Sequence, residues 1–222
     1  MPAPDTELIY RDDSLLVVNK PAGLLAVPGR GADKQDCLSV RIQRDFPNAL
    51  VVHRLDMATS GLLVFARGVE IQRRLSQMFR DHEVAKLYVA LVQGRVESPT
   101  GEVDLPIAAD WPNRPLRKID VDTGKASLTR YRVLDYGNGA AETLLRDTQS
   151  ELILETSRVE LEPVTGRTHQ LRVHMAAIGH PIVGDALYGV PATDRMMLHA
   201  CSLRFIHPVN GILLDLQSAP PF

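Results

Sequence analysis

The stretch HRLDMATSGLLVFA, residues 53–66, decides how the chain around it folds. It opens with polar and charged residues that include a single acid, Asp56, and it ends in an apolar run, LLVFA. A short apolar run beside turn-forming residues predicts a strand that is buried on both faces. A carboxylate at the end of such a strand is held on a rigid element. Asp56 is therefore the first candidate for a reactive group.

The pattern on either side of this stretch predicts a mixture of strands and helices. Apolar runs predict strands at 15–18 and 86–94, two or three more between 126 and 161, and short ones after residue 180. Helical spacing predicts helices over 36–46 and 69–82, and a third in TGRTHQLRVHMAAIG (165–179), capped by Thr168 and ended by Gly179. Residues 104–118 predict an irregular excursion, and residues 137–139 a turn. Without regular βαβ spacing, an α+β fold with a mixed, largely antiparallel sheet is favoured.

Composition indicates an ordinary globular protein. With 222 residues, 45% hydrophobic and 23% charged, the chain suits one domain, or one domain with two lobes. No apolar run approaches the roughly 20 residues that span a bilayer, and MPAPDTELIY lacks the pattern of a secretion signal. The two cysteines, Cys37 and Cys201, argue against a disulfide scaffold or a thiolate zinc site. We expect a reduced, cytoplasmic protein.

Charge is informative only through its distribution. The net charge is −2, but residues 111–132 hold six basic residues against two acids, and residues 135–162 hold two against seven. Arginine outnumbers lysine twenty to five, and guanidinium groups suit phosphate contacts and stacking on bases. Ordinary solvated faces explain the same pattern equally well. Charge alone does not identify a nucleic-acid partner.

Several common kinds of site lack their motifs. His169 and His174 are five residues apart and so lie on different helix faces, which argues against a metal site. The nucleotide-binding patterns GxxxxGK[ST] and GxGxxG and the hydrolase pattern GxSxG do not occur. What remains is Asp56 and a basic helix start with Arg167. A carboxylate near that arginine would stay ionised, as a catalytic group or in an ordinary structural ion pair.

Six stretches together resemble one known family. They are NKPAGLLAVPGR (19–30), RIQRDFPNALVVHRLDMATSGLLVF (41–65), KLYVA (86–90), DLPIAADWPNRP (104–115), TGRTHQLRVHM (165–175) and GHPIVGD (179–185). In this order they resemble the RluA family of RNA pseudouridine synthases, and the DWPNRP block resembles its short members. The chain departs from the family between Leu134 and Glu162, where it is longer and more acidic. A surface hairpin extension would explain this departure, since loop insertions cost little.

The resemblance implies a fold, an activity and partners. It implies one catalytic domain over residues 1–222, with two lobes, the pseudouridine synthase fold, helices flanking the sheet, a central RNA-binding cleft and no accessory N-terminal RNA-binding domain. Such enzymes break the glycosidic bond of a uridine, turn the base and rejoin it through a ring carbon, without metal or cofactor. The implied partners are a tRNA anticodon stem-loop, 23S-type large-subunit rRNA, or both. A monomer with no membrane contact is expected.

The resemblance also assigns roles to residues of the site. It makes Asp56 the indispensable carboxylate, which attacks the sugar or the ring or removes a sugar proton. Arg167 is expected to pair with Asp56, and Tyr88 to stack on the target base. Arg54 matches the family residue that fills the space left by a flipped uridine.

Further contacts are expected around this set. Leu171 would pack against the pocket wall. Lys20, Arg30 and Arg114 are candidate phosphate contacts, with solvated surface charge as the alternative. His53 is expected to contact RNA or to position its neighbours rather than to act as a general base. Trp111 stacks on a base or, more simply, anchors its own loop.

Two other functions compete with this hypothesis. A nucleic-acid glycosidase would attack the same carbon, but most glycosidases use two carboxylates and only Asp56 is a credible candidate. A non-catalytic RNA-binding protein would not need Asp56, Tyr88 and Arg167 together.

Overall fold

The chain divides into two compact units in a computed structural model that describes residues 6–136, 155–189 and 193–222. The first unit is Met1–Lys86 with His199–Pro221, and the second is Leu87–Leu198 with Phe222. The chain passes between them within strands β5 (Ala85–Gln93) and β11 (Leu198–Ile206). No helix in the described residues is long and apolar enough to cross a membrane.

The first unit is a sheet built around β4 (Ser60–Arg67), the strand predicted from LLVFA. One edge of β4 pairs antiparallel with β2 (Leu15–Lys20), which pairs in turn with β1 (Glu7–Arg11). The other edge pairs with β3 (Ala49–Val51) and, in parallel at its start, with β11. β12 (Leu213–Gln217) extends the sheet from β11. Helices α1 (Leu38–Asp45) and α2 (Val69–Arg80) complete the unit, with a short 3-10 turn at Ala32–Lys34.

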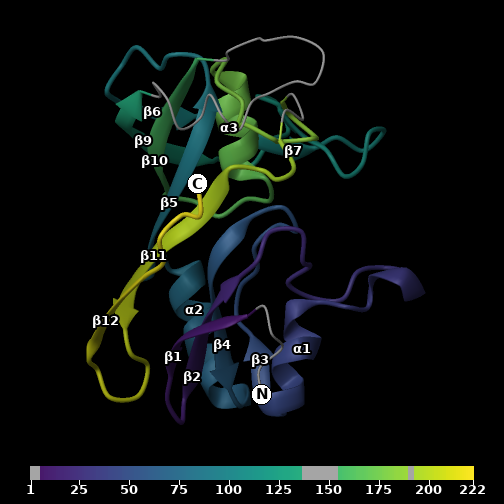
Figure 1. Ribbon diagram of the computed structural model, residues 1–222, viewed down its shortest axis with the longest axis vertical. Coiled ribbons are helices and arrows are strands. Elements are labelled where there is room, and N and C mark those ends of the chain that lie inside the picture. Colours follow the sequence, from purple (N-terminus) through teal and green to yellow (C-terminus); the bar gives the residue numbers. More distant parts are fainter. Residues whose placement is uncertain (1–5, 137–154, 190–192) are drawn as a thin grey trace. The chain divides into compact units, whose positions relative to one another are not determined.

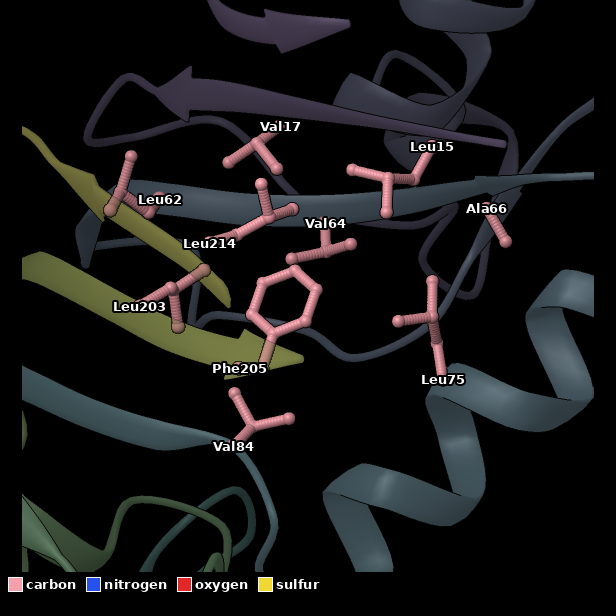
Figure 2. Close-up of a cluster of buried hydrophobic side chains, with 10 residues drawn as sticks. All are labelled: Leu15, Val17, Leu62, Val64, Ala66, Leu75, Val84, Leu203, Phe205 and Leu214. Carbon is pink, nitrogen blue, oxygen red and sulfur yellow. The ribbon is translucent and has the colours of Figure 1, made fainter. Parts of the chain in front are cut away.

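The core of this unit lies between the sheet and α2 (Figure 1). Alternate residues of β4 point into it, because successive side chains of a strand face opposite sides. Figure 2 shows them meeting Leu75 of α2 and Phe205 of β11. The cluster comprises Leu15, Val17, Leu62, Val64, Ala66, Leu75, Val84, Leu203, Phe205 and Leu214. Seven of the eight residues of β4 are buried, which confirms the predicted strand with two buried faces.

Gly61 permits the close pairing of β4 with β11. Its φ is +115°, and a Cβ atom there would lie 2.3 Å from the carbonyl oxygen of Ala200 and 2.5 Å from its nitrogen. Only glycine fits such a position. Beside it, Ser60 Oγ lies 2.9 Å from His199 Nδ1, whose Nε2 lies 3.1 Å from Ser218 Oγ. These buried contacts fix the start of β4, directly after the loop that carries Asp56.

The second unit is an antiparallel sheet with a helix and a small hairpin. The sheet runs in the order β5, β10 (Thr156–Pro163), β9 (Leu128–Tyr136) and β6 (Thr100–Asp104). Helix α3 (Gln170–Ala177) lies beside β9 and β10 (Figure 1), and its first six residues are all buried. β7 (Ile107–Ala109) and β8 (Arg117–Ile119) form a separate two-stranded sheet.

The α+β class and the largely antiparallel sheet are confirmed, and two local predictions are wrong. Residues 104–118 are not wholly irregular, because β7 and β8 lie within them. The residue before α3 is His169, in the left-handed conformation with φ 57°, so Thr168 is not the cap. Gln170, the first residue of α3, holds the preceding loop, since its Oε1 accepts hydrogen bonds from the Arg167 N–H (2.9 Å) and the Thr165 hydroxyl (2.7 Å). The predicted turn at 137–139 lies outside the described residues.

Candidate active site

Asp56 lies in the loop between β3 and β4 of the first unit, and it is half-buried. Its carbonyl accepts the Thr59 N–H at 3.1 Å, which closes a turn just before β4. The next carbonyl, that of Met57, accepts the Gly23 N–H at 2.8 Å and the Lys20 ammonium at 3.1 Å. The backbone is therefore anchored at Asp56 itself and at the residue that follows it.

Lys20 is an internal support of this loop. The residue is fully buried, and its Nζ also donates to the carbonyls of Pro21 and Leu24, at 2.8 Å each. A buried ammonium is tolerated where carbonyl oxygens surround it in this way. The prediction that Lys20 contacts a phosphate is wrong, because no RNA could reach this nitrogen. Instead, the residue links the NKPAG turn to the Asp56 loop.

His53 supports the same loop from the side of α2. Its Nε2 accepts the N–H of Val64 at 3.1 Å, and its ring stacks on Phe79 with centroids 4.3 Å apart and planes 21° from parallel. Burial, with a smaller effect of the charge on Lys86, lowers the pKa of His53 from 6.5 to about 3. The ring is therefore neutral, with its proton on Nδ1. These contacts are those of a residue that positions its neighbours, and both that role and the alternative of an RNA contact stay predictions.

The other predicted residues of the first unit face outward. Arg54, which directly follows His53, is exposed, and so is Arg30 on the loop after β2. Both side chains are accessible to a large ligand. The first unit thus brings together Asp56, Arg54 and their internal supports, Lys20 and His53.

Arg167 lies in the second unit, just before α3. Its side chain is exposed, and its Nε donates to the carbonyl of Ala126 at 3.2 Å. Gln170, which accepts the Arg167 N–H, also donates to the Leu128 carbonyl at 2.9 Å and to Thr129 Oγ1 at 3.0 Å. The loop that presents the guanidinium is thus tied to the start of β9. Its pairing with Asp56 stays a prediction.

Three further predicted residues also belong to the second unit. Tyr88 is a half-buried residue of β5, opposite Leu161 of β10. Leu171, in the first turn of α3, is 6% exposed. Arg114 lies on the β7–β8 connection, with its guanidinium carbon 3.6 Å from the centroid of the Trp111 ring. Both residues of this stacked pair are exposed.

The histidines expected not to form a metal site have other partners. His174 Nδ1 lies 2.9 Å from Thr129 Oγ1, and its Nε2 lies 2.9 Å from the Leu105 carbonyl. His169 Nδ1 lies 2.7 Å from the hydroxyl of Tyr188. In the part of the chain that the structure describes, no three His, Cys, Asp or Glu side chains are grouped to hold a metal ion.

Sequence analysis missed Gln170 and Tyr188, which organise the surroundings of Arg167. The Tyr188 hydroxyl accepts the Arg117 N–H at 2.8 Å across 71 residues of chain. No local pattern announces such a contact. Only their place in the sequence could have indicated them, because both residues lie in or beside stretches that resemble the family.

Comparison with known proteins identifies the chain. The model of the family described as RNA pseudouridylate synthase matches residues 14–177. The chain belongs to this family, whose enzymes are isomerases that act on RNA, and within it to the RluA type. It is 46% identical to "Dual-specificity RNA pseudouridine synthase RluA" of Escherichia coli K12, over 97% of this chain and 93% of that protein. It is 45% identical to the protein of the same name from Yersinia pestis, over 97% and 99%.

Solved structures agree with the family. "Human RNA Pseudouridylate Synthase Domain Containing 1" superposes with a TM-score of 0.78 at 31% identity, covering 98% of this chain and 84% of that one. "Human RNA Pseudouridylate Synthase Domain Containing 4" has a TM-score of 0.72 at 24% identity, over 97% and 88%, and so shows the same fold. The resemblance seen in the six sequence stretches is confirmed.

Proposed function

We propose that this enzyme isomerises specific uridines to pseudouridine in a tRNA anticodon stem-loop, in large-subunit rRNA, or in both, with Asp56 as its catalytic carboxylate. The observation that carries the proposal is the half-buried Asp56, on a loop anchored by Lys20 and His53 within the HRLD motif. The name of the Escherichia coli relative, a dual-specificity RNA pseudouridine synthase, supports more than one RNA substrate.

The reaction needs one carboxylate and a closed pocket. Asp56 attacks the sugar or the ring, or removes a sugar proton, and the bond between the sugar and the uracil nitrogen breaks. The detached uracil stays bound, turns, and is joined to the sugar through a ring carbon. Arg167 keeps Asp56 ionised and aimed, because an opposite charge stabilises the carboxylate. Tyr88 stacks on the base, and Leu171 lines the pocket wall.

The target uridine must leave its helix to be reached, at a cost of a few kcal/mol. Arg54, which is exposed and stands two residues before Asp56, fills the vacated space with its planar guanidinium. Arg30 and Arg114 contact phosphates of the same RNA. The enzyme acts as a monomer in the cytoplasm, as one globular domain with two lobes.

Replacing Asp56 with Asn tests the proposal. We expect the wild-type protein to convert a stem-loop RNA without a change in its mass, with pseudouridine detected by carbodiimide mapping. Asp56→Asn should bind the RNA in a filter assay and form no product. Asp13→Asn is the matched control, because this carboxylate is fully exposed, 3.8 Å from Arg67. Pseudouridine formed by Asp56→Asn would exclude Asp56 as the catalytic group.

The same assay separates the rival functions. A glycosidase would release uracil and lower the mass of the RNA, and a binding protein would leave the RNA unmodified. Relative to the wild type, Arg54→Ala should lose more activity on the stem-loop than on an unpaired oligonucleotide. Only in the stem-loop does the flipped uridine leave a gap in a base stack that a side chain must fill. Equal loss on both RNAs would remove Arg54 from this role.

A further inference from the structure

A cavity of about 760 Å³ lies within the second unit. Its walls are the β7–β8 hairpin, the turn at 120–125 and the loop at 166–168 that carries Arg167. This volume falls within the roughly 300–1,000 Å³ that is usual for small-molecule sites. The cavity therefore has room for a ligand larger than an ion, beside a residue of the proposed catalytic set.

The lining of this cavity carries an excess of positive charge. Its cationic residues are Arg117, Lys118, Lys125 and Arg167, and its acids are Asp110 and Asp120. Asp120 is already engaged: it accepts the Thr123 N–H at 2.9 Å and pairs with Lys118 at 3.0 Å. These contacts lower the pKa of Asp120 to about 2.

With Lys118 paired to Asp120, the lining keeps three other cationic residues, Arg117, Lys125 and Arg167, and one other acid. That acid is Asp110, whose carboxylate also accepts the Asn113 amide at 3.0 Å. An anion is the complementary ligand.

The three cations are held on separate, hydrogen-bonded segments. Arg117 begins β8, and its N–H donates to the Tyr188 hydroxyl. The backbone of Lys125 exchanges two hydrogen bonds with Ile107, at 2.9 and 3.0 Å. Arg167 is tied to Ala126 through its Nε. These bonds fix the backbone at Arg117 and Lys125 and the side chain of Arg167, so fewer groups have to be ordered when an anion binds.

Arg117 carries a charge on a side chain that is half-buried. Its Nε is buried and has no hydrogen-bond acceptor among the described residues. An unsatisfied charged group costs free energy, and such a group calls for a physical reason. A bound anion would offset the charge of this guanidinium, even where Nε itself stays covered.

An aromatic surface adjoins the charged lining. Trp111 and Pro112 also line the cavity, and Trp111 is 69% exposed. Arg114 lies against the indole ring. Nucleobases stack on exposed aromatic rings and on guanidinium planes. Phosphate-binding charge next to a stacking surface fits a nucleotide.

We propose that this cavity binds one nucleotide of the substrate RNA other than the target uridine. Arg117 and Lys125 contact its phosphate, and Trp111 stacks on its base. Arg167 borders the cavity, so a nucleotide held there would be a near neighbour of the uridine that reacts. The inference rests on the proposed function, because it takes the substrate to be RNA.

Trp111 is the only tryptophan of the chain and reports directly on the cavity. We expect stem-loop RNA to change its fluorescence, with roughly tenfold weaker apparent affinity in Arg117→Ala and in Lys125→Ala. Each variant should also lower the slope of log affinity against log[KCl] by about one. Trp111→Ala, followed by filter binding, should bind about tenfold more weakly with an unchanged slope.

Arg130→Ala is the matched control, since Arg130 is an exposed residue of β9 that pairs with Glu102 at 2.8 Å. It should keep wild-type affinity, slope and turnover. Thermal melts confirm that each variant is folded. If Arg117→Ala does not fold, Lys125→Ala alone tests the contact with the phosphate.

Wild-type affinity and slope in folded Lys125→Ala and Trp111→Ala would overturn the inference. A response of Trp111 to inorganic phosphate that RNA does not displace would also overturn it. A wild-type protein that binds RNA but forms no pseudouridine would instead contradict the proposed function.

Discussion

His53 illustrates how a titratable side chain can stabilise a fold by remaining neutral. It accepts a backbone N–H of β4 with one nitrogen and stacks on Phe79 of α2. Protonation would remove that acceptor and place a charge near Lys86 in a poorly solvated site. The Asp56 loop and the core of the first unit are thus joined through a ring that must not be charged.

This requirement predicts a pH dependence of stability. With a pKa of about 3 when folded and 6.5 as the reference, the unfolded chain binds more protons between these pH values. The free energy of unfolding should therefore fall as the pH is lowered through this window, with His53 contributing up to about 1.4 kcal/mol per pH unit. Urea denaturation between pH 7 and 4 would measure the slope.

His53→Gln should show a shallower slope than the wild type, whatever its absolute stability. His82→Asn is the control, because His82 is exposed and in a left-handed conformation that Asn tolerates. It should keep the wild-type slope. Identical slopes in His53→Gln and the wild type would show that His53 is not the group responsible.

Single residues also show what sequence can and cannot predict. Asp56 could be proposed as a catalytic residue because the motif that carries it is contiguous. Lys20 could not be recognised as buried, since lysine is seldom buried and one of its acceptors, Met57, lies 37 residues away. The requirement for glycine at position 61 comes from the close backbone of Ala200, more than a hundred residues further along the chain.

At the scale of elements, Tyr188 braces three segments of the second unit. Its hydroxyl accepts the Arg117 N–H from β8 and lies 2.7 Å from His169 Nδ1, at the start of α3. The second contact is a hydrogen bond in either direction, because a phenol hydroxyl can both donate and accept. The turn before it is held by a buried pair, in which Asp185 accepts two bonds of 2.7 Å from Arg172 of α3 and the Leu187 N–H at 2.9 Å.

Tyr188→Phe should therefore destabilise the protein by about 1–3 kcal/mol, because it leaves the Arg117 N–H without its acceptor. Chemical denaturation measures this loss, and Trp111 fluorescence reports whether the β7–β8 connection changes. Tyr131→Phe is the matched control, since within the described residues no hydrogen bond involves its hydroxyl. If both variants were as stable as the wild type, the hydrogen bonds of the Tyr188 hydroxyl would make no measurable contribution to stability.

The elements that could be predicted are those with enough residues to show a period. Helices α1 and α2 and strands β2, β4 and β5 carry several turns or alternations and were found within a few residues of their ends. Strands β7 and β8 have three residues each, too few for alternation to appear. Their pairing depends on contacts such as those of Ile107 with Lys125, which no local pattern contains.

The distribution of charge over the whole molecule is more informative than its net charge. A net charge of −2 does not by itself attract RNA. The basic cavity lining of Arg117, Lys125 and Arg167 and the acidic residues 135–162 lie in the same part of the sequence, so their charges largely cancel in the sum. The fold class followed from spacing, whereas the activity followed only from the resemblance. Chemistry depends on residues that are distant in sequence, and no periodicity joins Asp56 to Arg167.

The connection between β9 and β10 allows a test of the acidic region. Tyr136 at the end of β9 is the register partner of Ser157 in β10, so the chain leaves and returns at neighbouring points. Residues 139–153 contain three acids and one arginine. Replacing them with a short Asn-Gly linker should preserve the fold, because a shorter connection between β9 and β10 costs less entropy to close and Asn-Gly favours a tight turn.

We expect this shortened protein to melt within a few degrees of the wild type, to form pseudouridine at the wild-type rate, and to bind stem-loop RNA at least as tightly, since two net negative charges are removed. Circular dichroism melts, carbodiimide mapping and filter binding measure the three quantities. A linker of the original length, in which the three acids and the arginine are replaced by Asn and Gln, separates the effect of charge from that of length. Loss of turnover in a folded, shortened protein would show instead that the departure from the family at residues 134–162 contributes to substrate recognition.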